Sequence, residues 1–359
     1  MDLSTWLRPL QADVISQDQV VLYASNMFVK SWVENHYLAQ IHQICQALAK
    51  NPNLQIIVKE GVKPAPKAVE SSSTQTTNHQ ESAVNFQQES DAPTKFESHL
   101  LSWRPTGHPD VLWLSSRAVL DGTKAIRGGI PLCLPWFGSP TDSPTRPGQG
   151  AGAHGFARTS PWTLLGSTQP ANDAPASFSF ELHHTGETSA LYPHSFCARL
   201  DITAGAELNV TLTLTNEDDH PFAIEAALHT YLHVGDVKDV TLEGLDGERY
   251  YDKVRERYAT HTGDVTFIGP TDRVYTSTQQ VQVVDPKLGR RIIVDKNGSG
   301  STIVWNPWSQ GAATMSDIGE GEWQNFVCVE TAAVRERALT LWPGHPHIMT
   351  QTLAVETLD

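Results

Sequence analysis

Two segments far apart in the chain offer a proton donor and a proton acceptor. His229 lies within segment 225–233, and an imidazole titrates near neutral pH, so it can act as an acid. Glu330 ends an apolar run that begins at Val327. A carboxylate there either forms a structural salt bridge or serves in a cleft, where burial raises its pKa. Together the two residues are candidates for general acid–base chemistry.

Two glycine-rich segments offer groups that could hold an anion. Arg127 is followed by Gly128 and Gly129, and His154 and Arg158 share segment 152–158. Glycines let backbone and ligand come close, and the planar guanidinium matches an oxyanion such as phosphate. An isolated Arg-Gly-Gly is more often a tight turn, and a lone histidine is more often structural. Two arginine-bearing loops in one region favour an anion site.

Other chemistries find little support in the sequence. His229 and His233 have the spacing of a helical metal pair, but no HExxH motif is present, so zinc is disfavoured. On a strand, His229 and Tyr231 would share one face, with His233 further along it. No P-loop, Rossmann fingerprint or GxSxG elbow occurs, so we expect no nucleotide, flavin or acyl-enzyme chemistry, no metal and no cofactor.

Composition narrows the class of protein further. The chain has 359 residues and a formal net charge of −14, which disfavours a nucleic-acid-binding surface. No apolar run approaches the ~20 residues of a membrane span, and the N-terminal residues lack the features of a signal peptide. Four scattered cysteines without a CxxC pair predict neither disulfides nor a zinc knuckle. We expect a cytoplasmic protein.

The elements that position these residues fall into three predicted parts. Residues 1–62 form a small α/β module, with strands at 20–23 and 54–58 and a helix over 26–49. Residues 63–95 are rich in Pro, Ser and Gln and predict a flexible, disordered linker. Residues 96–359 alternate apolar and polar side chains, as in 208–214, 178–182, 281–284 and 291–294. That pattern predicts one large, mainly β domain of sandwich type.

Taken together and in order, the motifs of the large domain resemble the D-hexose-6-phosphate mutarotases (glucose-6-phosphate 1-epimerases) of the aldose 1-epimerase superfamily. The motifs are His99-Leu100-Leu101-Ser102-Trp103-Arg104-Pro105, Asp110-Val111-Leu112-Trp113-Leu114-Ser115, Arg127-Gly128-Gly129-Ile130-Pro131, His154-Gly155-Phe156-Ala157-Arg158, His229-Thr230-Tyr231, Trp305-Asn306-Pro307-Trp308 and Cys328-Val329-Glu330. The resemblance implies a galactose-mutarotase-like β-supersandwich.

The same resemblance implies the site residues and the substrate, a hexose 6-phosphate. The six residues are the general acid His229, the general base Glu330, His154 at the anomeric centre, Asp317 on sugar hydroxyls, and Arg127 and Arg158 on the 6-phosphate. Anomers interconvert through the open-chain aldehyde, which needs one proton delivered to the ring oxygen and one removed from the C1 hydroxyl. An acid and a base on opposite sides of the site would do both without metal, redox cofactor or covalent intermediate.

The N-terminal module resembles domain I of the bacterial replication initiator DnaA, a KH-like α/β domain. The resemblance rests on 6–11, 22–29, Trp32-Val33 and Tyr37-Leu38, and the segment before Trp6 is shorter than the family's first helix. It implies a fusion joined within 80–98, with residual replication-protein contacts through 1–62. Two alternatives to an epimerase stay open: a sugar-phosphate-binding module without turnover, and a replication-interaction protein acting through 1–62.

Overall fold

A computed structural model describes residues 11–16, 19–24, 38, 41–42, 46, 51, 54–60, 83–85, 99–168 and 175–358. Two compact units divide the chain, one within the first 93 residues and one that holds 79–87 and 94–359. Each is described separately. No helix among the described residues is long and apolar enough to cross a membrane.

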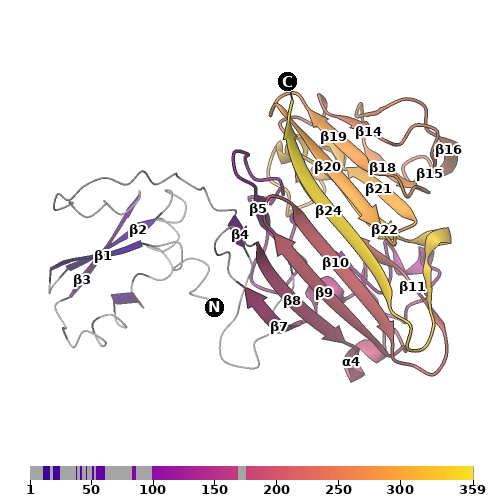
Figure 1. Ribbon diagram of the computed structural model, residues 1–359, viewed down its shortest axis with the longest axis horizontal. Helices are drawn as coiled ribbons and strands as arrows, with labels where there is room; N and C mark the ends of the chain where they lie inside the picture. The colour runs from indigo at the N-terminus through magenta and orange to yellow at the C-terminus, as the bar shows by residue number, and fades with distance from the viewer. Residues whose placement is uncertain are drawn as a thin grey trace. The chain divides into compact units, whose positions relative to one another are not determined.

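The N-terminal unit contains a three-stranded sheet in the order β1-β2-β3 (Gln11–Ser16, Gln19–Ala24, Gln55–Glu60) (Figure 1). β1 and β2 are antiparallel, whereas β2 and β3 are parallel. The strands predicted at 20–23 and 54–58 are confirmed as β2 and β3, and β1 was not predicted. Of the predicted helix over 26–49, only residues 38, 41, 42 and 46 are described, and all four are helical.

The predicted linker contains one described element. Ala83–Asn85 form β4, which pairs antiparallel with β5 (Ser102–Arg104) at the start of the second unit. The rest of 63–95 lies outside the described residues, so the linker and the three-part division of the chain stay predictions.

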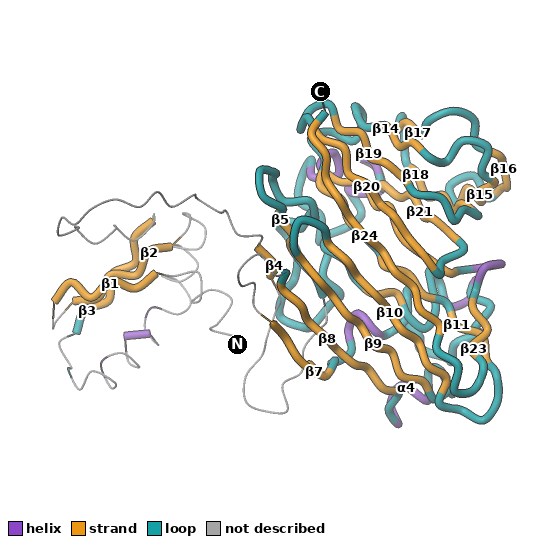
Figure 2. Tube along the Cα trace, in the orientation of Figure 1, coloured by secondary structure: helices purple, strands orange, loops and turns teal. Residues whose placement is uncertain are grey.

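The second unit is built on two large sheets (Figures 1 and 2). The nine-stranded sheet has the order β17-β14-β19-β20-β24-β10-β9-β8-β7, and its strands are β7 Thr163–Thr168, β8 Ala176–His183, β9 Phe196–Ala204, β10 Leu208–Asn216, β14 Thr241–Glu243, β17 Val265–Thr266, β19 Val281–Asp285, β20 Arg290–Asn297 and β24 His347–Thr357. The eight-stranded sheet has the order β16-β15-β18-β21-β22-β12-β6, with β13 also on β22, and its strands are β6 Leu132–Cys133, β12 Ala226–Leu228, β13 Tyr231–His233, β15 Arg249–Asp252, β16 Arg257–Thr260, β18 Thr271–Tyr275, β21 Ser301–Asn306 and β22 Phe326–Ala333.

Short elements complete the unit. β11 (Phe222–Ile224) pairs with β23 (Leu339–Leu341). The helices are α4 (Gly186–Ser189), α5 (Trp308–Ala312) and four 3₁₀ turns, Pro140–Asp142, Ala157–Thr159, Glu322–Asn325 and Arg335–Arg337.

Side-chain alternation explains how the nine-stranded sheet packs. In β10 the apolar residues 208, 210, 212 and 214 are buried, and the residues between them are half-buried. Such a strand presents one face to the core and one to solvent. Side chains of both sheets, such as Leu200 and Val304, belong to one hydrophobic cluster. The predicted mainly β architecture and the four predicted strands are therefore confirmed.

The strand β22 is different because every one of its residues is buried. The apolar run noted in the sequence ends at Glu330, whereas the strand continues to Ala333. Its carboxylate-bearing residue therefore lies inside a fully buried strand, which is the starting point for the site.

Candidate active site

Strand register brings His229 and Glu330 together. β12 and β13 both pair with β22, through Leu228 with Thr331 and Tyr231 with Cys328. The two residues between β12 and β13 therefore lie opposite residues 329 and 330. As a result, the Nε2 atom of His229 lies 3.4 Å from Oε1 of Glu330. We expected acid and base on opposite sides of the site, whereas the structure places them side by side.

Aromatic rings and backbone hold the imidazole of His229. Its ring stacks on Tyr231, with centroids 4.8 Å apart and planes at 12°, and meets the edge of Trp305 at 5.9 Å. Its backbone N–H donates to the Pro131 carbonyl oxygen at 3.0 Å. The side chain keeps 9% of its surface exposed, whereas that of Glu330 keeps 1%. The histidine thus presents the accessible edge of the pair.

Burial decides the ionisation of the pair. It lowers the pKa of His229 well below the usual value, and nearby His154 and Arg158 lower it further. Burial raises the pKa of Glu330 well above its usual value, with a further contribution from Asp272. Among the described residues neither Glu330 oxygen has a hydrogen-bond partner, and neither does Nδ1 of His229. The pair is therefore held in its neutral form, with buried polar atoms whose hydrogen-bonding capacity is unused among the described residues.

His154 contacts the pair from the second glycine-rich segment. Its ring centroid lies 5.8 Å from that of His229 and 4.7 Å from that of Phe137. Burial lowers its pKa to about 3, and the charges of Arg158, Lys253 and Arg127 act in the same direction. The following Gly155 is required, since a Cβ there would lie 1.9 Å from the Leu134 carbonyl oxygen.

Arg127 and Asp317 bind each other. The Nε atom of Arg127 donates to Oδ2 of Asp317 at 3.1 Å, and Nη1 donates to the Tyr231 hydroxyl at 2.9 Å. These bonds occupy two of the five N–H donors of a guanidinium. The resemblance gave Arg127 and Asp317 separate roles, but in the structure they form one ion pair. This ion pair lies beside the Tyr231 ring, which stacks on His229.

The glycines after Arg127 are required by the fold. A Cβ on Gly128 would lie 2.4 Å from the Trp113 carbonyl oxygen, and one on Gly129 would lie 2.2 Å from that of Leu100. The close approach on the Cβ side is therefore to the chain's own backbone, and a ligand contact at these glycines stays a prediction.

Three cations surround the pair in a chain of net charge −14. Besides Arg127, they are Arg158, whose charge lowers the pKa of both His229 and Glu330, and Lys253. Arg158 donates from Nη2 to the Ala153 carbonyl oxygen at 3.0 Å. Five of the six expected site residues are thus joined to the acid–base pair by direct contacts or through Tyr231. The sixth, Arg158, acts on the pair through its charge.

Sequence reasoning missed two groups at the site. Lys253 follows β15 and forms an ion pair of 3.1 Å with Asp272 in β18, and its Nζ lies 5.8 Å from the ring centroid of Phe137. Burial raises the pKa of Asp272, and the charge of Lys253 opposes that shift. No local pattern marks either residue, because only the pairing of β15 with β18 brings them together.

Glu225 is a second omission, although it lies in the segment singled out for His229. Its carboxylate accepts from the backbone N–H groups of Phe137 (3.0 Å) and Arg335 (2.6 Å) and from the Ser143 hydroxyl. This buried carboxylate joins three loops and so supports Phe137, against which His154 packs. A buried acid with several donors is structural in this arrangement.

His233 does not join the site. Its Nδ1 lies 3.2 Å from the Asp110 carbonyl oxygen. It belongs to β13, so the helical spacing from His229 that would suit a metal does not arise.

Solved structures with a similar architecture include proteins described as mutarotases or mutarotase-like. A crystal structure from Salmonella typhimurium, described as that of "a putative mutarotase", has a TM-score of 0.68 and 31% identity, covering 78% of this chain and 89% of that one. A galactose mutarotase-like protein from Clostridium acetobutylicum has a TM-score of 0.60 at 12% identity, covering 77% and 99%, which shows the shared fold. The expected galactose-mutarotase-like fold is confirmed.

Sequence relatives define the family. Residues 98–353 match the family model described as Aldose 1-epimerase. The chain belongs to this family. An Escherichia coli (strain K12) protein named "Putative glucose-6-phosphate 1-epimerase" is 39% identical over 243 residues, which are 67% of this chain and 78% of the relative. A Cenchrus ciliaris protein of the same name is 35% identical over 259 residues, 69% and 76%.

The N-terminal resemblance is also confirmed. Residues 2–47 match the model described as DnaA N-terminal domain. The chromosomal replication initiator protein DnaA of Psychromonas ingrahamii is 42% identical over 60 residues, which are 16% of this chain and 13% of that protein.

Proposed function

We propose that the protein interconverts the α and β anomers of a hexose 6-phosphate, with glucose 6-phosphate as the preferred substrate. The observation that carries the proposal is the buried His229–Glu330 contact of 3.4 Å. The names of the Escherichia coli and Cenchrus ciliaris relatives support the substrate. The surplus of cations around the pair supports a phosphorylated sugar over a neutral one.

The reaction follows from one donor and one acceptor. His229 gives a proton to the ring oxygen while Glu330 takes the proton of the C1 hydroxyl, and the C1–O5 bond breaks to give the aldehyde. Rotation about the C1–C2 bond and reclosure with the roles reversed give the other anomer. Because both oxygens are bonded to C1, adjacent groups can serve them as well as opposed ones. His154 lies beside the reacting pair as the third polar group.

The proposed roles require a proton to move within the pair. Burial favours a protonated Glu330 and a neutral His229 before substrate binds. From their separation of 3.4 Å the two groups need only a small approach to hydrogen-bond distance for the proton to pass from the carboxyl to Nε2 of His229 when an anionic substrate enters. Since the carboxyl is 1% exposed, side chains of the site must also shift to admit the sugar.

Arg127 and Arg158 are proposed to hold the 6-phosphate, and Asp317 to bind hydroxyls. Each charge-assisted hydrogen bond to phosphate contributes roughly 1.5–3 kcal/mol. A phosphate at Arg127 would compete with Asp317, releasing that carboxylate to accept from the sugar. The exchange of partners couples phosphate binding to hydroxyl recognition.

Exchange spectroscopy of glucose 6-phosphate tests the proposal. Micromolar protein should raise the rate of exchange between the α and β proton signals, and His229→Gln should lower that increase about 100-fold or more. His183→Gln, on the nine-stranded sheet, is the matched control and should keep the wild-type rate. Tight binding of the sugar phosphate without faster exchange would instead identify a binding module.

A second function is proposed for the N-terminal segment, because residues 2–47 match the DnaA N-terminal domain. It would contact replication proteins independently of the epimerase site. Co-sedimentation of the full chain with a replicative helicase tests this. A chain that begins near residue 80 should lose the co-sedimentation and keep the anomer exchange, whereas equal behaviour of both chains would contradict the proposal.

A further inference from the structure

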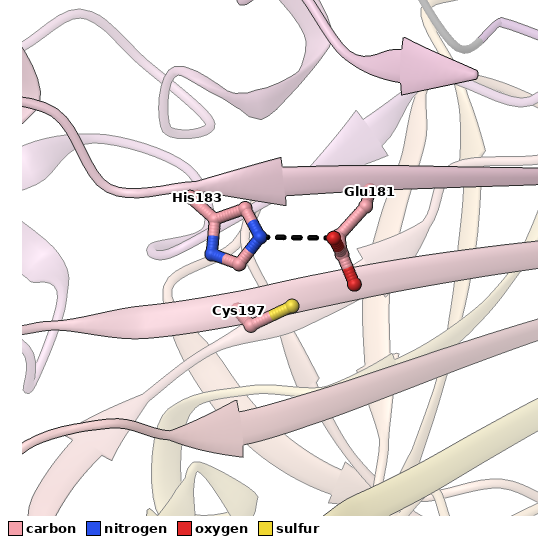
Figure 3. Close-up of side chains that lie close together, drawn as sticks. All are labelled: Glu181, His183 and Cys197. Carbon is pink, nitrogen blue, oxygen red and sulfur yellow. Dashed lines mark hydrogen bonds and ion pairs between the residues drawn. The ribbon is translucent and has the colours of Figure 1, made fainter. Parts of the chain in front are cut away.

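Three potential metal ligands converge on the nine-stranded sheet, away from the acid–base pair. Glu181 and His183 alternate with buried residues along β8, so both lie on the face that points away from the core. His183 stands directly opposite Cys197 of β9. Figure 3 shows the imidazole, the carboxylate and the sulfur gathered around one point.

The distances suit a single ion. One ligand atom from each of the three residues lies within 4.8 Å of the others. Nε2 of His183 is 2.9 Å from Oε2 of Glu181. Ligands of a tetrahedral zinc ion lie about 2.0–2.3 Å from the metal, hence about 3.4 Å from each other. Side-chain rotations that move the ligand atoms by about an ångström would therefore bring all three into the coordination sphere of one ion.

A fourth residue lies near the second nitrogen of the imidazole. Oε2 of Glu217 lies 3.6 Å from the other ring nitrogen, Nδ1 of His183. Histidines that bind metals commonly donate their second N–H to a carboxylate, which fixes the ring and strengthens the ligand. The neighbouring cation does not compete, since Arg199 makes three hydrogen bonds to Asp201.

From this geometry we propose that Glu181, His183 and Cys197 bind a divalent transition-metal ion of the zinc type, oriented by Glu217. A thiolate and an imidazole favour such an ion over Mg²⁺ or Ca²⁺, which prefer oxygen ligands. Binding replaces the S–H bond of Cys197 by a metal–sulfur bond and releases the proton to solvent. Three protein ligands leave one position for water or a further ligand. The site is separate from the epimerase proposal.

Cobalt binding to the full-length, tag-free protein after chelator treatment tests the proposal. Titration with Co²⁺ should give one ion per chain and a thiolate-to-cobalt charge-transfer absorption. Cys197→Ser should remove that absorption and weaken binding at least 10-fold, and Glu217→Gln should weaken it about 10-fold while retaining the absorption. Zn²⁺ should displace the cobalt and protect Cys197 from a thiol reagent.

A neighbouring group supplies the control. His194, Asp218 and His220 also bring potential ligands together, but without sulfur. His220→Gln should leave the charge-transfer absorption and the affinity unchanged. The proposal is overturned if the wild-type protein binds no Co²⁺, if Cys197→Ser binds as tightly as wild type, or if His220→Gln abolishes binding. Circular dichroism of each variant verifies that the fold is kept.

Discussion

His229 and Glu330 meet in the eight-stranded sheet, and His183 and Glu181 meet on the outer face of the nine-stranded sheet. The first pair is 3.4 Å apart and buried, and burial pushes the pKa of its histidine down and that of its glutamate up. The second is 2.9 Å apart and half-exposed. There the hydrogen bond from His183 lowers the pKa of Glu181. Burial lowers the pKa of His183, but its bond and attraction to Glu181 outweigh this and raise it.

The contrast shows that identical residue types become a neutral pair or an ion pair mainly according to their burial, with neighbouring charges contributing. Desolvation penalises each charge separately, whereas pairing favours both charges together. The buried pair thus holds a transferable proton, and the exposed pair holds two charges.

The largest expected difference between the pairs is in catalysis. Glu330→Gln should lower the rate of glucose 6-phosphate anomer exchange 10²–10⁴-fold, because the amide cannot accept the proton. Glu181→Gln should leave the rate unchanged. Polarimetry and exchange spectroscopy measure both variants, and equal rates for the two would remove Glu330 from the mechanism.

The second expected difference is in stability. The pKa of Glu330 is raised in the folded state, so its contribution to stability is present below the unfolded value of about 4.5 and is lost as pH rises. Removing this group by Glu330→Gln should therefore raise the free energy of unfolding at pH 7 by up to about 3 kcal/mol, at about 1.4 kcal/mol per pH unit. The gain should vanish near pH 4.5. Urea unfolding at both pH values measures this gain. A variant that is less stable than the wild type at pH 7 would show that other interactions compensate the desolvation of the Glu330 carboxyl.

A third comparison uses one arginine near the acid–base pair, in the 3₁₀ turn Ala157–Thr159, and one in the nine-stranded sheet. Arg158→Gln should lower the ratio of kcat/KM for glucose 6-phosphate to that for glucose about 10–100-fold, since only the first substrate has a phosphate. Arg199→Gln, whose guanidinium binds Asp201, should leave the ratio unchanged. An unaltered ratio in Arg158→Gln would place the phosphate elsewhere.

The smallest effect is expected at the exposed pair in metal-free protein. The raised pKa of His183 gives stability below pH 6.5 that is lost as pH rises through that pKa. The lowered pKa of Glu181 gives stability above pH 4.5 that is lost as pH falls. His183→Gln should therefore lower the free energy of unfolding by at most about 0.5 kcal/mol between pH 4.5 and pH 6.5 and leave it unchanged at pH 9. Unfolding in chelator-containing buffer measures it, and a larger loss at pH 9 would indicate a packing role.

Among the described strands, those whose alternation of apolar and polar residues is visible within a short segment were predicted from the sequence. The run 208–214 predicted β10 because its period of two is visible within seven residues. β1, by contrast, was not predicted. Glu330 is a related case: the apolar run ends there, but the strand continues to Ala333 in pairing with β21 on one side and β12 on the other, which no pattern in its own segment shows.

The sequence alone determined the family, the mainly β class and the identity of the proposed catalytic residues, because each is encoded in short motifs and periodicities. Only the tertiary structure decided that His229 touches Glu330, that Arg127 binds Asp317, and that His183 stands beside Cys197. These contacts join segments separated by up to 190 residues, as between Arg127 and Asp317. The physical reason is that strand register and burial, which set both the distances and the ionisation, arise from the packing of the whole sheet and from no single segment.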